Sequence, residues 1–236
     1  MNVKQLQEWL NTKGATLKTD GIGGPATRSA FIKAFVNKNA TKITEQELID
    51  LARKLGDTNS KRIKAVGKVE SSGSAYNSDG LVKILYERHY FYKFVKKNIS
   101  YVEIPGAYLA YPSYGGYTLD ADNDGINDSW EKLSYAVCID PVGALSSVSI
   151  GMFQVMGIYY KELGYNNPIE LLWDASRGEK AHYNMLAGYI LNVAKIKSSF
   201  LKISTKASDN EPFCRAYNGP KYKENQYHTK LAKAML

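Results

Sequence analysis

The sequence is poor in side chains that bind transition metals or form covalent cross-links, because its 236 residues include only two cysteines and three histidines. Cys138 and Cys214 cannot supply the disulfide framework of a small secreted domain, and we expect both thiols to be reduced and buried. The histidines, His89, His182 and His228, are far apart in the sequence, which argues against a zinc-dependent peptidase or amidase. Cys138 also lacks the neighbouring residues typical of a cysteine protease.

Long apolar stretches are missing too. No run approaches the roughly 20 residues that a membrane-spanning helix needs. Residues 1–6 also lack the apolar core of a signal peptide. We therefore expect a chain that is made in the cytoplasm and has neither a transmembrane segment nor a signal peptide.

The composition is that of an ordinary globular protein, with 44% hydrophobic and 23% charged residues, so one large core and a small accessory domain are expected. The formal net charge of +8 favours an anionic partner. Nucleic acid is a poor candidate, because the lysines are spread along the chain and no zinc-finger or RNA-binding motif is present. Bacterial wall polymers and outer-membrane surfaces, which carry carboxylates and phosphates, fit the charge better.

Two units are predicted. In residues 1–40, the spacing of Val3, Leu6 and Leu10 predicts one amphipathic helix, and the apolar residues between positions 26 and 34 predict a second. A glycine-rich turn over residues 20–25 joins them. A short polar linker over residues 36–41 leads to the larger unit.

The larger unit, residues 43–236, begins with a well-marked helix. Thr44 and Glu47 form a capping box, and Gly56 is placed to end this helix in a left-handed cap. Residues 101–117, rich in tyrosine, proline and glycine, predict a long loop or a short β-excursion. Further helices are expected over residues 83–94, 130–136, 149–163, 168–175, 179–200 and 211–217, so the predicted fold class is mainly α.

One glutamate stands out for its position. Ile63, Val66 and Glu70 recur at helical spacing, so the carboxyl group of Glu70 shares the apolar face of its helix and is separated from the lysines around it. Burial against an apolar surface disfavours the ionised form and raises the pKa of a carboxyl group. Glu70 can therefore remain protonated near neutral pH and act as a general acid.

Three blocks occur in order along the chain: Glu-Ser-Ser-Gly at 70–73, Ser-Ile-Gly-Met-Phe-Gln at 149–154 and Ala-Tyr-Asn-Gly at 216–219. This order resembles the lysozyme superfamily in its goose-type and lytic-transglycosylase branch. Two further blocks, at 84–91 and 215–222, are more closely similar to the phage N-acetylmuramidase family, and the resemblance extends from about residue 43 to the C-terminus. It implies a lysozyme-like helical fold and a phage endolysin that hydrolyses the peptidoglycan bond following N-acetylmuramic acid.

The same resemblance implies roles for single residues. Ser149, Gln154, Tyr217 and Asn218 are expected to line the sugar groove near Glu70, where Gln154 offers a donor and an acceptor for an acetamido group or a water. Tyr217 can pack beside Glu70 and donate a hydrogen bond to it or to the sugar. His89 is a further candidate for substrate binding, with an ordinary structural role as the alternative.

The second carboxylate of the reaction is left open by the sequence. A base is needed if the enzyme is an inverting hydrolase, and Asp79, Glu87 and Asp140 are all candidates. For Glu87 the alternative is a structural ion pair with Arg88. A lytic transglycosylase, which leaves 1,6-anhydromuramic ends, needs no second carboxylate. A third possibility is a non-catalytic wall-binding virion protein.

The N-terminal unit resembles a peptidoglycan-binding domain of the three-helix type. The resemblance depends on Leu6-Gln7, on the Asp-Gly-Ile-Gly turn at 20–23 and on Thr27, and it covers about two helices. A helical appendage without a binding role is the alternative. We expect a monomer that binds glycan strands and acts at the periplasmic or extracellular wall after synthesis in the host cytoplasm.

An acidic segment at 120–131 fits the template of a calcium loop. Oxygen ligands are expected from Asp120, Asp122, Asp124, Asp128 and Glu131, around the glycine at position 125. No helix is predicted before the loop, and the aliphatic residue is shifted to position 126, so a solvated acidic turn is the alternative. Any calcium here would be structural, and no cofactor is expected to be needed for catalysis.

Overall fold

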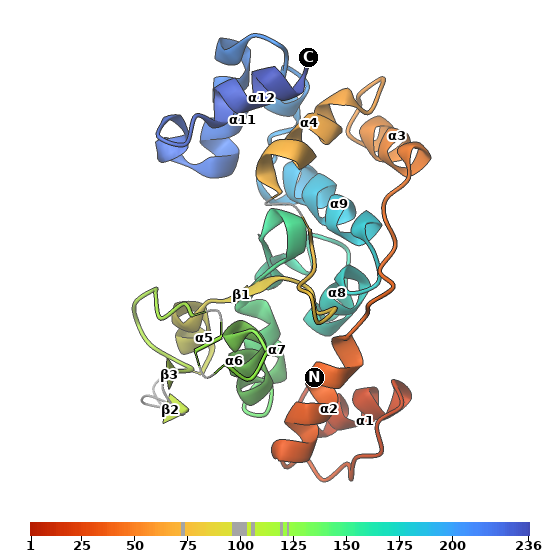
Figure 1. The fold of residues 1–236 in the computed structure, drawn as a ribbon, viewed down its shortest axis with the longest axis vertical. Helices are drawn as coiled ribbons and strands as arrows, with labels where there is room; N and C mark the ends of the chain where they lie inside the picture. Colours follow the sequence, from red (N-terminus) through yellow and green to blue (C-terminus); the bar gives the residue numbers. More distant parts are fainter. Residues whose placement is uncertain (72–73, 96–102, 105–106, 119, 122) are drawn as a thin grey trace.

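The protein is described by a computed structural model, which covers residues 1–71, 74–95, 103–104, 107–118, 120–121 and 123–236. Figure 1 shows a mainly α-helical molecule with the N-terminal helices at one end and the C-terminal helices at the other. In the described part of the chain, no helix is both long enough and apolar enough to cross a membrane.

The N-terminal unit consists of α1 (Val3–Thr12) and α2 (Pro25–Phe35), as the apolar spacing predicts. The buried amide of Gln7 ties the connecting turn to both helices. Its Nε2 atom donates to Asp20 Oδ1, to the carbonyl of Ile22 and to Thr27 Oγ1, and its Oε1 atom accepts from the backbone N–H of Gly21. The residues that suggested a binding domain therefore form one hydrogen-bonded cluster that shapes the turn.

The N-terminal helices pack directly on the larger unit. Phe31 and Phe35 are fully buried and contact Trp130, with ring centroids 6.1 and 5.5 Å from it. Trp9 meets Trp173 edge to face at 5.4 Å. These rings belong to the same apolar core as the rest of the molecule.

The larger unit begins with α3 (Glu45–Lys54) and α4 (Lys61–Glu70). The predicted capping box is confirmed, since the Thr44 side chain accepts from the backbone of Glu47 and the Glu47 side chain accepts from the backbone of Thr44. Gly56 has a φ of +83° and ends α3 as predicted. Ile63 and Val66 are fully buried, so Glu70 does lie on the buried face of α4.

A small antiparallel sheet forms the centre of the molecule, where the sequence predicts only helix. Its strand order is β1 (Ile84–Tyr86), β4 (Val148–Ile150) and β5 (Val155–Met156), with Leu85 opposite Ser149 and Ser149 opposite Met156. The predicted helix over 83–94 is therefore wrong at its start, and only α5 (Arg88–Val95) is helical. Strands of two or three residues are too short to show an alternating pattern that could be told from a helix.

The predicted helix over 149–163 is wrong throughout. It is replaced by β4, β5 and two 3₁₀ turns, η1 (Gly151–Phe153) and η2 (Gly157–Tyr159). Gly151 has a φ of +67°, and a side chain on Gly157 would lie 2.1 Å from the carbonyl oxygen of Leu145. These two glycines allow a tight, irregular segment that an amphipathic pattern does not reveal.

The helices predicted over residues 130–136, 168–175 and 211–217 are confirmed. The predicted 179–200 helix is broken, because α9 (Glu179–Gly188) passes into a π-helical turn, η3 (Tyr189–Val193), and Lys195 then adopts a φ of +54°. The other elements are α6 (Asp128–Ala136), α7 (Pro141–Ser146), α8 (Pro168–Ala175), α10 (Lys197–Phe200), α11 (Ala207–Asn218), η4 (Pro220–Lys223) and α12 (Tyr227–Ala234), with a short hairpin of β2 (Glu103–Ile104) and β3 (Ala107–Tyr108). The hairpin confirms the β-excursion expected within 101–117.

Both cysteines are free thiols. Cys214 is fully buried, and burial raises its pKa to about 12. Cys138 is only partly buried, so the prediction of burial is confirmed for Cys214 and wrong for Cys138.

Candidate active site

Glu70 is the last residue of α4, and its carboxyl group meets the end of α11. Asn218 Nδ2 donates a hydrogen bond of 2.8 Å to Glu70 Oε2. Burial raises the pKa of Glu70 to about 7, although the Asn218 hydrogen bond and the positive charge of Lys230 act in the opposite direction. A carboxyl group with this pKa is partly protonated at neutral pH, as a general acid must be.

The position of α4 depends on a close helix contact one turn before Glu70. A β-carbon on Gly67 would lie 2.3 Å from the hydroxyl oxygen of Tyr183, which is on α9. Tyr183 in turn packs edge to face on Phe153 of η1, at 5.1 Å between ring centroids. The absence of a side chain at position 67 therefore lets α4 approach α9 and the segment that follows the sheet.

Tyr217 and Asn218 reach the site from the last turn of α11. Tyr217 stacks on Phe213 at 5.5 Å and meets Tyr189 edge to face at the same distance. Burial, together with the nearby Glu70 carboxyl group, raises the pKa of Tyr217 well above its usual value, so this side chain stays a neutral phenol. The Oδ1 atom of Asn218 is buried and has no hydrogen-bond partner among the described residues.

The floor of the site is the turn between β4 and β5. Ser149 Oγ donates to Gln154 Oε1 at 2.7 Å, and Gln154 Nε2 donates to the carbonyl of Gly151 at 2.8 Å. Gln154 has a left-handed backbone, with a φ of 48°, which is strained for a residue with a side chain and often marks a functional position. A β-carbon on Gly151 would lie 1.9 Å from the buried ring of His182.

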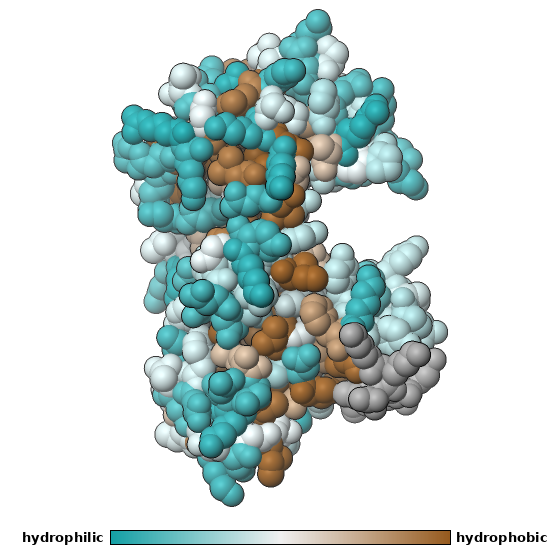
Figure 2. Space-filling model, turned by 180° about the vertical axis from the view of Figure 1, so that it is seen from behind, coloured by the Kyte–Doolittle hydropathy of each residue, from teal (hydrophilic) through white to brown (hydrophobic). Residues whose placement is uncertain are grey.

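A cavity of about 160 Å³ joins the floor to α11. Gln154, Tyr217 and Tyr189 are among its lining residues, together with Phe153, Val155, Met156 and Tyr159. The structure thus brings together the two predicted groove residues Gln154 and Tyr217, and Asn218, which follows Tyr217 in α11, donates a hydrogen bond to Glu70. Figure 2 shows a deep hollow in the outline of the molecule, between its upper part, which holds the C-terminal helices, and the part below.

Glu87 lies between β1 and α5 and is held by an aromatic hydroxyl. Tyr117 donates a hydrogen bond of 2.6 Å to Glu87 Oε2. His89 Nδ1 lies 3.3 Å from the same oxygen but makes no hydrogen bond with it. The alternative of a Glu87–Arg88 ion pair is wrong, because the Arg88 guanidinium group donates to the carbonyls of Ser113 and Tyr114 and stacks on Tyr111.

The other two candidate carboxylates have local structural roles. Asp79 Oδ1 accepts from the backbone of Leu81 within a turn. Asp140 is the N-cap of α7 and accepts from the backbone of Gly143. Their carboxyl oxygens therefore stabilise a turn and a helix start, whereas Glu87 accepts a bond from a side chain.

Comparison with known proteins identifies the family of the chain. The family model for N-acetylmuramidase matches residues 59–236, which is most of the chain and includes Glu70, the floor and α11. The chain belongs to the N-acetylmuramidase family. It is therefore a peptidoglycan hydrolase of the glycosidase type.

A solved structure resembles this muramidase along its whole length. It is the "Crystal structure of Burkholderia AP3 phage endolysin", with 26% sequence identity and a TM-score of 0.70. The match covers 99% of the muramidase chain and 92% of the endolysin chain. Among curated proteins, a sequence search finds no match.

The acidic loop of the muramidase is only partly described, because Asp122 lies outside the described residues. Asp120 accepts from the backbone of Asp124 and Gly125, and Asp128 accepts from the backbone of Ala121. Within the described ranges, no group of three or more acidic, histidine or cysteine side chains is arranged to hold a metal ion. Calcium binding by this loop stays a prediction.

Several residues of the site were not singled out by the sequence. Tyr189 and Tyr159 line the cavity, and Tyr117 binds Glu87. Tyr117 falls in the tyrosine-rich segment that was expected to be a loop, but nothing in its spacing points to Glu87. Tyr189 falls in a segment predicted as regular helix, and its position depends on the π-helical turn.

Proposed function

We propose that this protein is a phage endolysin that hydrolyses the β-1,4 bond between N-acetylmuramic acid and N-acetylglucosamine. The observation that carries the proposal is the half-buried carboxyl group of Glu70, with its pKa raised to about 7 and a hydrogen bond from Asn218. The similarity to the Burkholderia phage endolysin supports the role in host lysis. The positive net charge favours approach to an anionic cell wall.

Glu70 acts as the general acid. It donates its proton to the glycosidic oxygen while the sugar on the cleaved side develops oxocarbenium character. Asn218 orients the carboxyl group by binding Oε2. Tyr217 remains neutral beside it and supplies a hydroxyl group and an apolar ring face for the sugar.

Glu87 is the base in this proposal. Among the three candidates, and counting only partners in the described part of the chain, its carboxylate alone accepts a hydrogen bond from another side chain, that of Tyr117. That bond fixes one oxygen and leaves the other available to a water molecule. Activation of a water by a second carboxylate on the opposite face of the sugar is the mechanism of inverting glycosidases.

Ser149 and Gln154 form the surface on which the acetamido group of a sugar would rest. Two polar atoms of the Gln154 side chain are engaged by Ser149 and Gly151, so the amide is held in one orientation. A fixed amide of this kind costs little conformational entropy when it binds a substrate group. His89 stays a candidate for substrate binding on the Glu87 side.

We further propose that Asp120, Asp124 and Asp128, in the acidic loop, help to bind a structural calcium ion. The experiment is calorimetric titration of the protein with calcium chloride, with Asp120→Asn as the comparison. Heat of binding that disappears in the variant supports calcium. Equal heats for the two proteins contradict it.

The test of the main proposal is mass spectrometry of the fragments released from purified peptidoglycan, with borohydride reduction of chain ends. Reducible muramic acid ends are expected. Anhydro ends would make the enzyme a lytic transglycosylase, and reducible glucosamine ends a glucosaminidase. Glu70→Gln is expected to bind peptidoglycan without cleaving it. If this variant degrades peptidoglycan as well as wild type does, Glu70 is not the general acid.

A further inference from the structure

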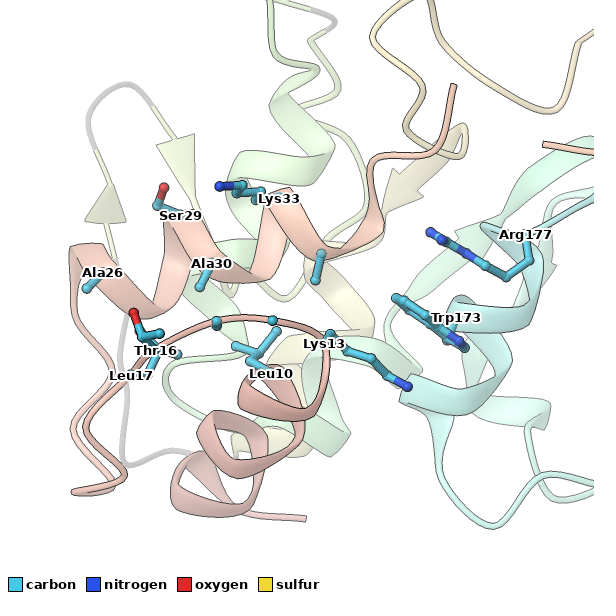
Figure 3. A pocket seen from close by; sticks show the side chains of 13 residues that line it. Leu10, Lys13, Thr16, Leu17, Ala26, Ser29, Ala30, Lys33, Trp173 and Arg177 are labelled. Atoms are coloured by element: carbon cyan, nitrogen blue, oxygen red, sulfur yellow. The ribbon is translucent and has the colours of Figure 1, made fainter. Parts of the chain in front are cut away.

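A larger pocket, with a volume of about 500 Å³, lies at the N-terminal end of the molecule, between the N-terminal helices and the end of α8 (Figure 3). One wall is the last turn of α1 with the loop after it, and a second is one face of α2. Trp173 and Arg177 form the third wall. The helix that carries Glu70, α4, is in the other half of the molecule (Figure 1).

The pocket exists only because two parts of the chain are packed together. Trp173 contacts Trp9 at 5.4 Å and Phe35 at 5.9 Å between ring centroids. Just beyond α2, Asn37 Nδ2 donates to the carbonyl of Ser176 at 2.8 Å. These contacts fix the end of α8 against α1 and α2, so the pocket is preformed.

Every charged residue that is known to line the pocket is a cation. Lys13, Lys33 and Arg177 contribute to its walls, and no acidic residue does among those that the structure describes. In the part of the chain that the structure describes, none of the three is in an ion pair. Three unpaired cations around one pocket repel each other, and an anionic ligand would relieve that repulsion.

Two of these cations already contact the faces of the Trp173 ring. Lys13 Nζ lies 4.4 Å and Arg177 Cζ 4.1 Å from the centroid of the indole ring. Figure 3 shows the Trp173 side chain between those of Lys13 and Arg177. Stacking of a sugar ring on this indole is therefore disfavoured, while the cations stay in position to bind a negative charge.

Arg177 has unused capacity to donate. Its Nε atom donates to Ser176 Oγ, but its buried Nη2 atom has no acceptor among the described residues. A buried donor without a partner costs free energy, so the described residues leave the guanidinium group of Arg177 incompletely hydrogen-bonded. A guanidinium group binds a carboxylate with particularly favourable geometry.

The rest of the pocket is shaped for small apolar groups. Four alanines line it, Ala15, Ala26, Ala30 and Ala34, beside Leu10 and Leu17. Methyl groups on the ligand would fit against this surface and gain free energy by leaving water. A bare phosphate would use the cations alone and leave this apolar part unfilled.

We propose that this pocket binds a peptidoglycan stem peptide through its free carboxylate, with the methyl groups of its alanines against the apolar wall. The proposal rests on the proposed function, because it takes peptidoglycan as the substrate. Arg177 and Lys13 bind the carboxylate, and Lys33 adds positive charge from α2. The pocket would then attach the enzyme to the peptide while Glu70 acts on the glycan.

The test is isothermal titration calorimetry of the full chain with a synthetic alanine-containing stem peptide. Three proteins are compared: wild type, the double variant Lys13→Gln/Arg177→Gln, and Lys54→Gln, which removes an exposed charge from α3. We expect wild type and Lys54→Gln to bind equally and the double variant to bind at least 10-fold more weakly. Thermal melting shows whether each variant is folded, and Ala30→Leu, which fills the pocket and keeps the cations, is expected to lose binding as well.

Two further ligands test whether the carboxylate and the apolar part of the peptide are both needed for binding. The same peptide with amidated carboxylates is expected to bind at least 10-fold more weakly, and inorganic phosphate is expected not to displace the acid peptide. Equal binding of acid and amide peptides, undiminished binding by the double variant or displacement by phosphate would each overturn the proposal. Binding is measured without turnover, so failure of the muramidase reaction would be seen separately, in the fragment analysis.

Discussion

Asn218 and Glu70 are 148 positions apart in the sequence, and Asn218 Nδ2 donates a hydrogen bond of 2.8 Å to Glu70 Oε2. The bond joins the end of α11 to the end of α4. It favours the ionised form of the carboxyl group, whereas burial favours the neutral form and has the larger effect, which leaves the pKa of Glu70 at about 7. The proton that the proposed mechanism needs therefore depends on two opposing contributions.

Replacing Asn218 with alanine is expected to raise the pKa of Glu70 further, because the hydrogen bond that favours the charged form is lost. The alkaline limb of the pH profile of kcat/KM, where the general acid loses its proton, should move to higher pH. Asn39→Ala, in the exposed linker, is the matched control and should leave the profile in place. A profile that stays unchanged in Asn218→Ala would show that the limb belongs to another group.

Glu70→Gln is expected to be more stable than wild type at alkaline pH. The folded-state pKa of about 7 exceeds the ordinary value of 4.5, so wild type loses stability as pH rises from about 4.5 to 7. Glutamine has no charge to bury, and the gain should be roughly 1–3 kcal/mol above pH 7 and vanish below pH 4.5. Urea unfolding at pH 4, 6 and 8 measures the difference, and a gain that is the same at all three values would contradict the raised pKa.

Glu87→Gln is expected to lower kcat by about 10²- to 10⁴-fold, the usual contribution of a general base. Tyr117→Phe should lower it less, because it removes only the bond to Glu87 Oε2. Asp79→Asn is the control for a carboxylate in a turn, and Asp140→Asn for one at a helix start. If either control loses kcat while Glu87→Gln stays fully active, the carboxylate changed in that control, and not Glu87, is the base.

Gly67→Ala is expected to destabilise the protein by about 1–3 kcal/mol and to lower activity, because the new β-carbon would meet the Tyr183 hydroxyl and push α4 away from α9. Tyr183→Phe removes the oxygen at 2.3 Å but leaves ring atoms at 3.0 Å. The double variant Gly67→Ala/Tyr183→Phe should therefore recover part of the loss. Additive effects of the two changes in thermal melting would show that the residues do not interact.

His182 is expected to weaken the fold in acid. Burial lowers its pKa to about 4, below the ordinary 6.5, so the unfolded chain binds more protons between these values and stability falls as pH falls through this range. His182→Leu should make the decline between pH 6.5 and 4 shallower than in wild type, whatever its effect on overall stability. The measurement is the free energy of unfolding against pH, and an unchanged slope would contradict the burial of a neutral imidazole.

Sequence patterns within a few residues correctly predicted helix starts, helix ends and the buried faces of helices. The α3 capping box, the Gly56 helix end and α8 each follow from residues within a few positions of one another. The apolar face of α4 likewise placed Glu70 correctly at the buried end of its helix. These features need no knowledge of the rest of the chain.

The central sheet and the broken helices could not be predicted in this way. β1 and β4 pair residues more than 60 positions apart, such as Ile84 and Ile150, and each strand is too short to show its own period. The bond from Tyr117 to Glu87 and the cavity shared by Gln154 and Tyr217 depend on that sheet. The sequence could therefore suggest which residues carry the chemistry but not how they are arranged.

The aromatic contacts between the N-terminal helices and the larger unit have a consequence for protein engineering. Trp130 is completely shielded from water, and Phe31 and Phe35 are part of that shield. A chain shortened by a cut at residues 36–41 would expose an apolar surface around Trp130 and Trp173, and such surfaces promote aggregation. The N-terminal helices are thus not an exchangeable module, and a chimaera that replaces them must also redesign the face they cover.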